Sequence, residues 1–521
     1  MKETSLGKLQ KTVDKQEKKI TELQELVRVR KEKYRLLQEK YKYLEKNMEQ
    51  TIEREINTRC KKLEEENDSL KEEIAKLKSL LNTDSNNSGI PTSQTPIDKK
   101  KRIPNSRKKS EKSIGGQRNH KKHKLEKFKE EELTDGYYYE IDKCPCGGEL
   151  NEIGVREKDE LDIEVRVKKI RHYFKEYKCK CCGREIKVPI PKHLKEENQY
   201  GNNVKALALS LVNEGFVSYH RTRELIRGFS SEEIDISEGY LVKLQQEASK
   251  KLENFIKELK RRILKEDIIH WDDTVIMINT NRACLRFYGT ENLALYTAHE
   301  KKDKDGIDED QILNLLGKDT IVVHDHNTVN YNNDYDFQNA ECCVHLIRDL
   351  EKIKENLNRK WAQELIELLV ETNKTRTEYI EHGDKYFEEE FIEEVQVKYD
   401  EILEIAKEDN RKDFNPYFGK DEKALINRLS NYKNNYLMWI IRFEVPFSNN
   451  LSERSLRSSK TKMKVSGQFK NILNAQYYSN IKSYIETCKR NDINIHEALV
   501  RLLENNPYSI NEILNNEKNS E

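Results

Sequence analysis

Residues 6–81, the first part of the chain, repeat apolar side chains at alternating spacings of three and four. This repeat predicts a helix with one apolar seam, as in a coiled coil. The seam positions, with a few polar breaks, are Leu6, Leu9, Val13, Gln16, Ile20, Leu23, Val27, Arg30, Tyr34, Leu37, Tyr41, Leu44 and Met48. Ile52, Ile56 and Cys60 follow at spacings of four, a stutter that locally unwinds a supercoil, before the seam resumes at Leu63. We expect an oligomerisation coil; the alternative is a long amphipathic helix folded back on its own chain.

The pattern changes at about residue 266, where short apolar runs alternate with polar turns. These runs, DIIHWDDTVIMI, CLRFYG, NLALYTA and DTIVVHD, predict β-strands. Residues 200–265 and 341–442 instead have amphipathic helical patterns. Strands with helices around and within them predict an α+β core.

The composition excludes several classes of protein. The chain has 521 residues, enough for three or four domains of about 100–200 residues each. Charged residues make up 36% of it, and no apolar run is long enough to cross a membrane. The N-terminus MKETSLGKLQ has no apolar signal region. We therefore expect a cytoplasmic protein.

The net charge of +1 hides a local basic segment. Residues 82–98 are rich in Asn, Ser, Thr and Pro and predict a linker. Residues 99–124 then hold twelve Lys or Arg against one acid, Glu111. Such a segment can neutralise DNA phosphates, with Lys108, Lys109 and Arg118 as candidate contacts, or it can be a merely solvated linker.

Two cysteine pairs, each followed by glycine, flank about thirty residues of strand-like alternation. The pairs are Cys144 with Cys146 and Cys179 with Cys182. Because close thiols in a reducing compartment favour tetrahedral zinc, we predict a structural zinc ribbon. The first pair is one residue tighter than the usual C-x-x-C, and buried free thiols are the alternative.

Two aspartates follow apolar runs that we expect to be strands: Asp272 after Ile-Ile-His-Trp and Asp325 after Ile-Val-Val-His. Adjacent strands lie about 5 Å apart, so the two carboxylates could share hard divalent cations such as Mg²⁺ or Mn²⁺. The alternative is a pair of aspartates that cap turns.

Glu453 lies at an expected helix start, in PFSNNLSERSLRSSK. With Asn450 as N-cap it would be a capping-box glutamate. The basic residues that follow it without an intervening acid favour a metal ligand beside a DNA backbone. They are Arg454, Arg457, Lys460, Lys462, Lys464 and Lys470.

His345 and Arg348 lie one helical turn apart and could contact phosphate from one helix face. A core histidine is the alternative for His345. His270, His324 and His326 flank the aspartates, and we expect structural roles for them.

The order of these segments resembles the transposases of the insertion-sequence-66 family, bacterial DDE transposases with an RNase H-like catalytic domain. The motifs that carry the resemblance are GGQxxH, the cysteine pairs, WDDT, VVHD, CCVHLIRDL, NNLSER and KVSGQF. The family's usual D-E-T corresponds to Asp272-Asp273-Thr274, so the resemblance implies Asp272, Asp325 and Glu453 as the catalytic acids that bind magnesium.

The resemblance also implies a fold and an activity. The fold is an α+β multidomain protein in which a mixed sheet with flanking helices forms the RNase H-like core. The expected parts are a coiled coil at 1–81, a basic linker at 82–135, a zinc-ribbon-like DNA-binding domain at 136–195, a helical DNA-binding region at 196–265, the first part of the core at 266–340, a helical insertion at 341–445, C-terminal core helices with Glu453 at 446–500, and a tail at 501–521. The implied activity is metal-dependent cleavage and strand transfer at the ends of an insertion sequence. The protein would bind the terminal inverted repeats and the target DNA. It would act as a homodimer or higher oligomer and be associated with the nucleoid. The alternatives are an inactive transposase-derived DNA-binding protein and a purely hydrolytic nuclease.

Overall fold

The computed structural model describes residues 5–44, 50–82, 126–191, 194 and 196–516. Contacts divide the chain into two units. One comprises Met1–Arg107, Asn198–Tyr219 and Gly239–Glu521, and the other comprises Lys108–Glu197 and His220–Glu238. Among the described residues, no helix has the length and apolar character needed to cross a membrane.

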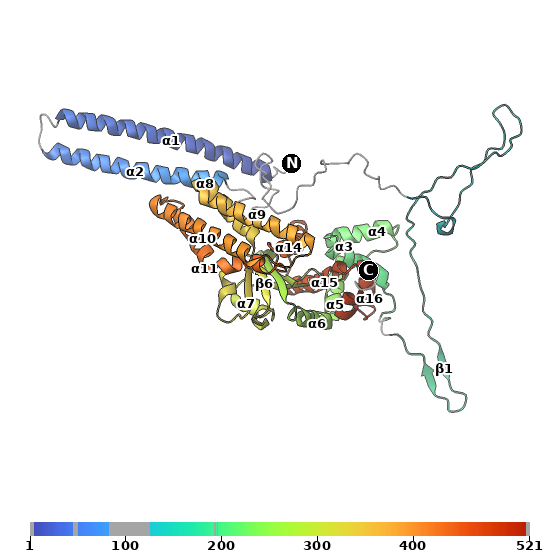
Figure 1. Ribbon diagram of the computed structural model, residues 1–521. Helices are drawn as coiled ribbons and strands as arrows, with labels where there is room; N and C mark the ends of the chain where they lie inside the picture. The colour runs from blue at the N-terminus through green and yellow to red at the C-terminus, as the bar shows by residue number, and fades with distance from the viewer. Residues whose placement is uncertain (1–4, 45–49, 83–125, 192–193, 195, 517–521) are drawn as a thin grey trace. The chain divides into compact units, whose positions relative to one another are not determined.

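The N-terminal residues form two antiparallel helices, α1 (Ser5–Leu44) and α2 (Gln50–Asn82) (Figure 1). Lys19 Nζ lies 3.3 Å from a carboxylate oxygen of Glu73. The hydroxyl of Tyr34, which comes later in α1, donates to Glu64, which comes earlier in α2, at 3.4 Å. The two helices therefore run in opposite directions. The half-buried positions of α1 are those of the expected seam: Val13, Gln16, Ile20, Leu23, Val27, Arg30, Tyr34 and Leu37. The expectation of one continuous helix over 6–81 is wrong. The seam packs within one chain, which is the alternative that the sequence left open.

A five-stranded mixed sheet lies at the centre of the larger unit, in the order β5-β4-β3-β6-β7. Its strands are β3 (Ile268–Ile278), β4 (Asn281–Gly289), β5 (Ala294–His299), β6 (Ile321–His324) and β7 (Gln338–Glu341). The first three form an antiparallel meander, and β6 and β7 run parallel to β3. The four apolar runs correspond to β3–β6. The sequence Gln-Asn-Ala-Glu of β7 gave no strand signal because it is short and polar.

The outer edge of β5 is covered by helix α15 (Ile472–Arg490). An edge strand exposes unpaired backbone groups, which proteins pair or cover. Here Ser483 accepts a hydrogen bond from the backbone N–H of Tyr296 at 2.8 Å, and Thr487 accepts one from that of Ala294 at 3.2 Å. Hydroxyl groups of α15 therefore satisfy donors that a further strand would otherwise pair.

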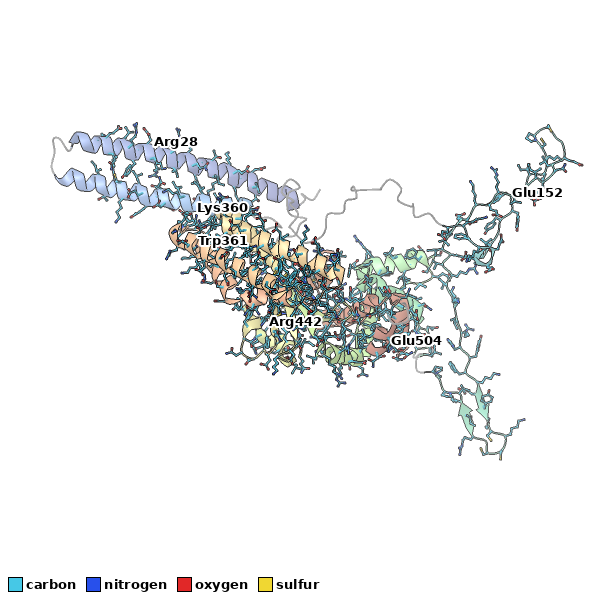
Figure 2. The ribbon with its side chains drawn as sticks, in the orientation of Figure 1. Arg28, Glu152, Lys360, Trp361, Arg442 and Glu504 are labelled. Carbon is cyan, nitrogen blue, oxygen red and sulfur yellow. The ribbon has the colours of Figure 1, made fainter. Side chains whose placement is uncertain are left out.

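The expected insertion after β7 is helical. Its helices are α8 (Cys343–Leu357), α9 (Lys360–His382), α10 (Glu389–Lys412), α11 (Gly419–Asn431), α12 (Lys433–Tyr436) and α13 (Met438–Ile441). Lys360 and Trp361 begin α9 and are labelled in Figure 2; Lys360 is exposed, and Trp361 is fully buried. The Trp361 indole donates to Glu422 at 3.1 Å, and the same carboxylate accepts from Arg359 at 2.8 Å. This buried ion pair joins the starts of α9 and α11.

The insertion also supports the segment that leads into helix α14 (Asn450–Ser466). Arg376 of α9 donates to the carbonyl of Val445 at 2.8 Å. The Cys343 N–H donates to the carbonyl of Phe447 at 3.1 Å. The start of α14 is therefore held by helices that lie far from it in sequence.

The remaining helices of the larger unit cover the core. They are α3 (Asn202–Asn213), α5 (Glu238–Lys251), α6 (Glu253–Ile263), α7 (Lys304–Asp308), α16 (Ile495–Leu503) and α17 (Ile510–Asn516). The C-terminal segment that we expected as a tail at 501–521 contains α17, which buries Ile510 and Ile513.

The smaller unit is mostly irregular and exposed. It contains most of α4 (Tyr219–Phe229) and a hairpin of β1 (Glu176–Lys178) and β2 (Glu185–Lys187). The strand-like alternation expected between the cysteine pairs yields no strand from 161 to 175. Its apolar side chains, Ile163, Val165 and Ile170, have no packed face beneath them and remain exposed. The segment around Glu152 is likewise extended and exposed (Figure 2).

Candidate active site

Asp272 and Asp325 lie where two parallel strands separate. Strands β3 and β6 pair as far as His270 and Val323. Asp272 follows two residues later and is still in β3, paired with Phe287 of β4, while Asp325 comes directly after the end of β6. The prediction that Asp272 ends its strand is wrong. It lies within β3, and the strand that ends beside it is β6.

Asp272 and Asp325 also interact electrostatically. Burial and the negative charge of Asp325 raise the pKa of Asp272 to about 8. Asp273, the next residue, points to the other face of the strand, where it lies 2.6 Å from Lys302. Of the two adjacent aspartates, only Asp272 therefore belongs to the carboxylate pair.

Glu453 reaches the same place from helix α14. His345 of α8 lies between the acids, with Nδ1 2.9 Å from Asp325 Oδ1 and Nε2 3.7 Å from Glu453 Oε1. Arg348, one turn further along α8, lies 3.6 Å from the same Glu453 oxygen. The three acids come from β3, from the end of β6 and from α14, so only the tertiary fold brings them together.

The α14 start differs from the expected capping box. Its N-cap is Asn449, not Asn450, and the Asn449 side chain makes no capping hydrogen bond. Instead, Asn449 is fully buried and donates from Nδ2 to the Trp271 carbonyl at 2.9 Å. Its Oδ1 lies 3.0 Å from Nδ1 of His270. Asn449 therefore ties the first turn of α14 to β3 beside Asp272.

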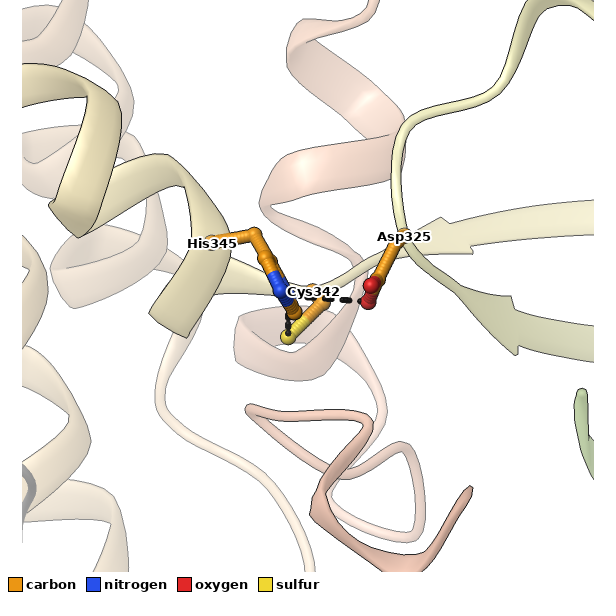
Figure 3. A group of neighbouring side chains, drawn as sticks. All are labelled: Asp325, Cys342 and His345. Carbon is orange, nitrogen blue, oxygen red and sulfur yellow. Dashed lines mark hydrogen bonds and ion pairs between the residues drawn. The ribbon is translucent and has the colours of Figure 1, made fainter. Parts of the chain in front are cut away.

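His345 also contacts a sulfur atom (Figure 3). Its Nδ1 is hydrogen-bonded to Cys342 Sγ at 3.4 Å, and Arg348 donates to its Nε2 at 2.8 Å. Burial alone would lower the pKa of His345, but the close contacts with Asp325 and Cys342 raise it to about 11. Because arginine only donates, Nε2 accepts from Arg348 only when the ring is neutral with its proton on Nδ1, whereas the raised pKa favours the charged ring, in which both nitrogens carry protons. In either protonation state, Nδ1 carries a proton.

The residues present fit a divalent cation with oxygen ligands. Asp325 Oδ1 is buried and forms an ion pair with His345 Nδ1 at 2.9 Å, without a well-aligned hydrogen bond among the described residues. A carboxylate oxygen in this position can accept a divalent cation as a further partner. Asp272 and Glu453 would complete an all-carboxylate set.

The three flanking histidines have structural partners, as the sequence indicated. His270 pairs with Asn449, and burial lowers its pKa. His324 lies 2.7 Å from the Asn339 side chain, and His326 lies 2.7 Å from Glu341.

The basic residues after Glu453 divide into an exposed set and a buried one. Arg457, Lys460 and Lys464 are exposed and share one face of α14 with Glu453, since they follow it at helical spacing. Arg454 is also exposed. Lys462 is buried: its Nζ contacts the carbonyl of Val212 at 3.4 Å, so the prediction that it binds DNA is wrong. It lies on the packed face of the helix.

Three further DNA-binding candidates, Lys108, Lys109 and Arg118, lie outside the described residues.

The four cysteines predicted to bind zinc lie on two separate turns. Cys144 and Cys146 lie on one turn, and Cys179 and Cys182 on another, each closed by backbone hydrogen bonds. Among the described residues, no three of these thiols come together as metal ligands. The residues between the two turns form no sheet that would join them. The zinc site therefore stays a prediction.

Sequence reasoning missed two residues of the site, Asn449 and Cys342. Cys342 was not singled out, although its spacing to His345 places both on one helical turn. Asn449 had no signal of its own, because its partners on β3 are remote in sequence.

Comparison with known proteins defines the class. The model of one protein family, described as the transposase IS66 family, matches residues 197–477. This range contains Asp272, Asp325 and Glu453, and its match identifies a transposase. The match covers more than half of the chain, which therefore belongs to the IS66 family of transposases. No curated protein matches the chain.

Proposed function

We propose that the chain is an active DDE transposase that cleaves and joins DNA at the ends of an insertion sequence. The observation that carries this proposal is the convergence of Asp272, Asp325 and Glu453 around His345. Family membership supports the substrate class, DNA. The sheet, an antiparallel meander continued by two parallel strands, supports the RNase H-like core that the resemblance implies.

In this proposal the three acids hold magnesium or manganese. When bound, the cations would activate the attacking oxygen and stabilise the leaving oxygen in an in-line displacement. The chain's own residues position the three acids for this reaction. Asn449 fixes α14 relative to β3, so that Glu453 stays beside the strand of Asp272.

The exposed basic face of α14 is a surface along which DNA would reach this site. Lys464 lies eleven positions after Glu453, which corresponds to roughly 16 Å along a helix. Arg457 and Lys460 lie between them on the same face. A phosphate backbone along this face would lead directly to the carboxylates, and counterion release would favour its binding.

An assay with paired-end DNA separates this proposal from its alternatives. The substrate is a duplex that carries the inverted repeats flanking the gene, with a supercoiled plasmid as target. The proposal predicts magnesium-dependent 3′-end cleavage followed by joining. Cleavage without joining would favour a hydrolytic nuclease, and neither product with DNA binding retained would favour an inactive binding protein.

A matched pair of variants tests the assigned site in that assay. Asp325→Asn removes a proposed metal ligand and should abolish both products. Asp273→Asn, which alters the aspartate paired with Lys302, should retain them. Unchanged product formation by Asp325→Asn would remove the assigned site.

Three further expectations remain predictions. They are the homodimer or higher oligomer, a structural zinc ion at the four cysteines, and a cytoplasmic, nucleoid-associated location.

A further inference from the structure

The acids at the candidate active site share their space with a thiol. Cys342 Sγ, His345 Nδ1 and a carboxylate oxygen of Asp325 lie within 4.8 Å of one another (Figure 3). They are the only such group of three potential metal ligands among the residues that the structure describes. Magnesium binding does not call for a sulfur atom, because magnesium prefers oxygen ligands.

We infer that Cys342, His345 and Asp325 form a site for a thiophilic divalent cation, zinc above all, that overlaps the magnesium site at Asp325. Zinc binds thiolate, imidazole and carboxylate ligands in a tetrahedron. Its usual bond lengths place a nitrogen and a sulfur ligand about 3.5 Å apart, and a nitrogen and an oxygen ligand about 3.4 Å apart.

The geometry is close to that requirement. The Nδ1–Sγ distance is 3.4 Å, and the Nδ1–Oδ1 distance is 2.9 Å. For the tetrahedral spacing the Asp325 carboxylate must move about half an ångström away from Nδ1, within the 4.8 Å that encloses the three ligand atoms. It has room to do so because its side chain is 31% exposed. Cys342 is buried beneath, where the N–H of Asn449 donates to its sulfur at 3.2 Å and fixes its position.

Charge and secondary contacts also favour the site. One thiolate and one carboxylate would neutralise a dication, which lowers the cost of placing it in a half-buried position. A zinc-bound histidine usually donates its other N–H to a carboxylate. Nε2 of His345 lies 3.7 Å from Glu453 and 2.8 Å from Arg348 Nη1. Arg348 itself lies 3.6 Å from the same Glu453 oxygen, so a turn of its guanidinium toward Glu453 would let Nε2–H donate to that carboxylate.

The overlap has a consequence that, unlike the site itself, rests on the proposed function. A zinc ion held through Asp325 would remove that carboxylate from magnesium, so zinc would inhibit strand transfer competitively with magnesium.

Cobalt(II) is the probe for the site, because a thiolate ligand gives it a charge-transfer absorption band. The experiment uses the full chain with Cys144, Cys146, Cys179, Cys181 and Cys182 replaced by serine, so that those thiols cannot contribute. Titration should give one equivalent of bound cobalt with a thiolate band, and zinc should displace it. Failure of this chain to bind cobalt with such a band would overturn the inference, whatever its activity.

Neighbouring cysteines provide the matched comparison. In the same background, Cys342→Ser should abolish the band. Cys343→Ser should keep it, because that sulfur lies away from the site, 3.2 Å from the Trp439 indole nitrogen. Survival of the band in Cys342→Ser would refute the assignment. Circular dichroism checks folding, and His345→Gln, at a half-exposed position, provides a second test: it should weaken cobalt binding roughly tenfold or more.

Discussion

The side chain of Asn449 donates a hydrogen bond to the backbone carbonyl of Trp271 at 2.9 Å. Trp271 immediately precedes Asp272 in β3, and Asn449 is the N-cap of the helix that carries Glu453. One buried amide thus links the backbone of the first acid to that of the third. The site depends on this link because no element contains both acids.

Asn449→Ala should therefore impair catalysis more than DNA binding. It leaves the Trp271 carbonyl and the His270 ring nitrogen without their buried partner, a loss of about 2–4 kcal/mol in unfolding free energy. A small displacement of Glu453 should lower kcat by roughly 100-fold. Denaturant unfolding, kcat and the Kd for DNA are the measurements.

Asn450→Ala is the control for that variant, because among the described residues the adjacent Asn450 side chain makes no hydrogen bond to β3. Equal effects of the two substitutions, or an Asn449→Ala enzyme with normal kcat, would argue against the positioning role.

The exposed lysines of α14 should account for part of the decrease in DNA affinity as the salt concentration rises. Lys460→Ala and Lys464→Ala each remove a proposed phosphate contact and should each reduce the slope of log K against log salt by about one. Lys462→Met, on the buried face of the same helix, should leave the slope unchanged. Binding titrations over a range of salt concentrations measure this. A slope that depends on Lys462 but not on its neighbours would contradict the assigned face.

Lys462 should also make stability depend on pH. Burial lowers the pKa of Lys462 to about 8, from 10.5 for an exposed lysine. Between these values the unfolded chain binds a proton that the folded chain does not, so stability rises with pH. From pH 7 to pH 9 the wild type should gain about 1 kcal/mol relative to Lys462→Met. At pH 7 the variant should be the more stable protein, because it buries no charge.

Chemical denaturation of both proteins at the two pH values tests this. Because other groups also titrate in this range, the difference between the proteins is the relevant quantity. A difference that does not change with pH would show that the pKa of Lys462 is not lowered in the folded protein.

The hydrophobic pattern predicted much of the fold, because most core elements bury a regular face. Strands β3–β6 and the helical insertion follow from their apolar periodicity. Strand β7 could not be predicted in this way, since its residues are polar and it forms through backbone pairing with β6. The seam of residues 6–81 predicted which side chains are buried. It could not predict the partner, because the same repeat packs equally well within a chain or between chains.

Some residues of the candidate site could also be predicted from the sequence, and others could not. Asp272, Asp325 and Glu453 were found because each stands beside a local signal and because the motifs resemble a family. The burial of Lys462 could have been predicted: Leu451, Ser455 and Ser459 form the packed face of α14, and Lys462 continues it at helical spacing. The role of Asn449 could not, since it depends on contacts with β3 that only the folded chain creates. Cys342 had only its spacing to His345 as a signal.

Binding of divalent metal by the carboxylates of Asp272, Asp325 and Glu453 is the central prediction. Crystals of the full chain soaked in manganese, measured for anomalous scattering, test this most directly. We predict a manganese peak about 2–2.5 Å from carboxylate oxygens of Asp272 and Asp325, with Glu453 beside it. Manganese bound elsewhere in the molecule, or a Glu453 side chain remote from both aspartates, would contradict the account.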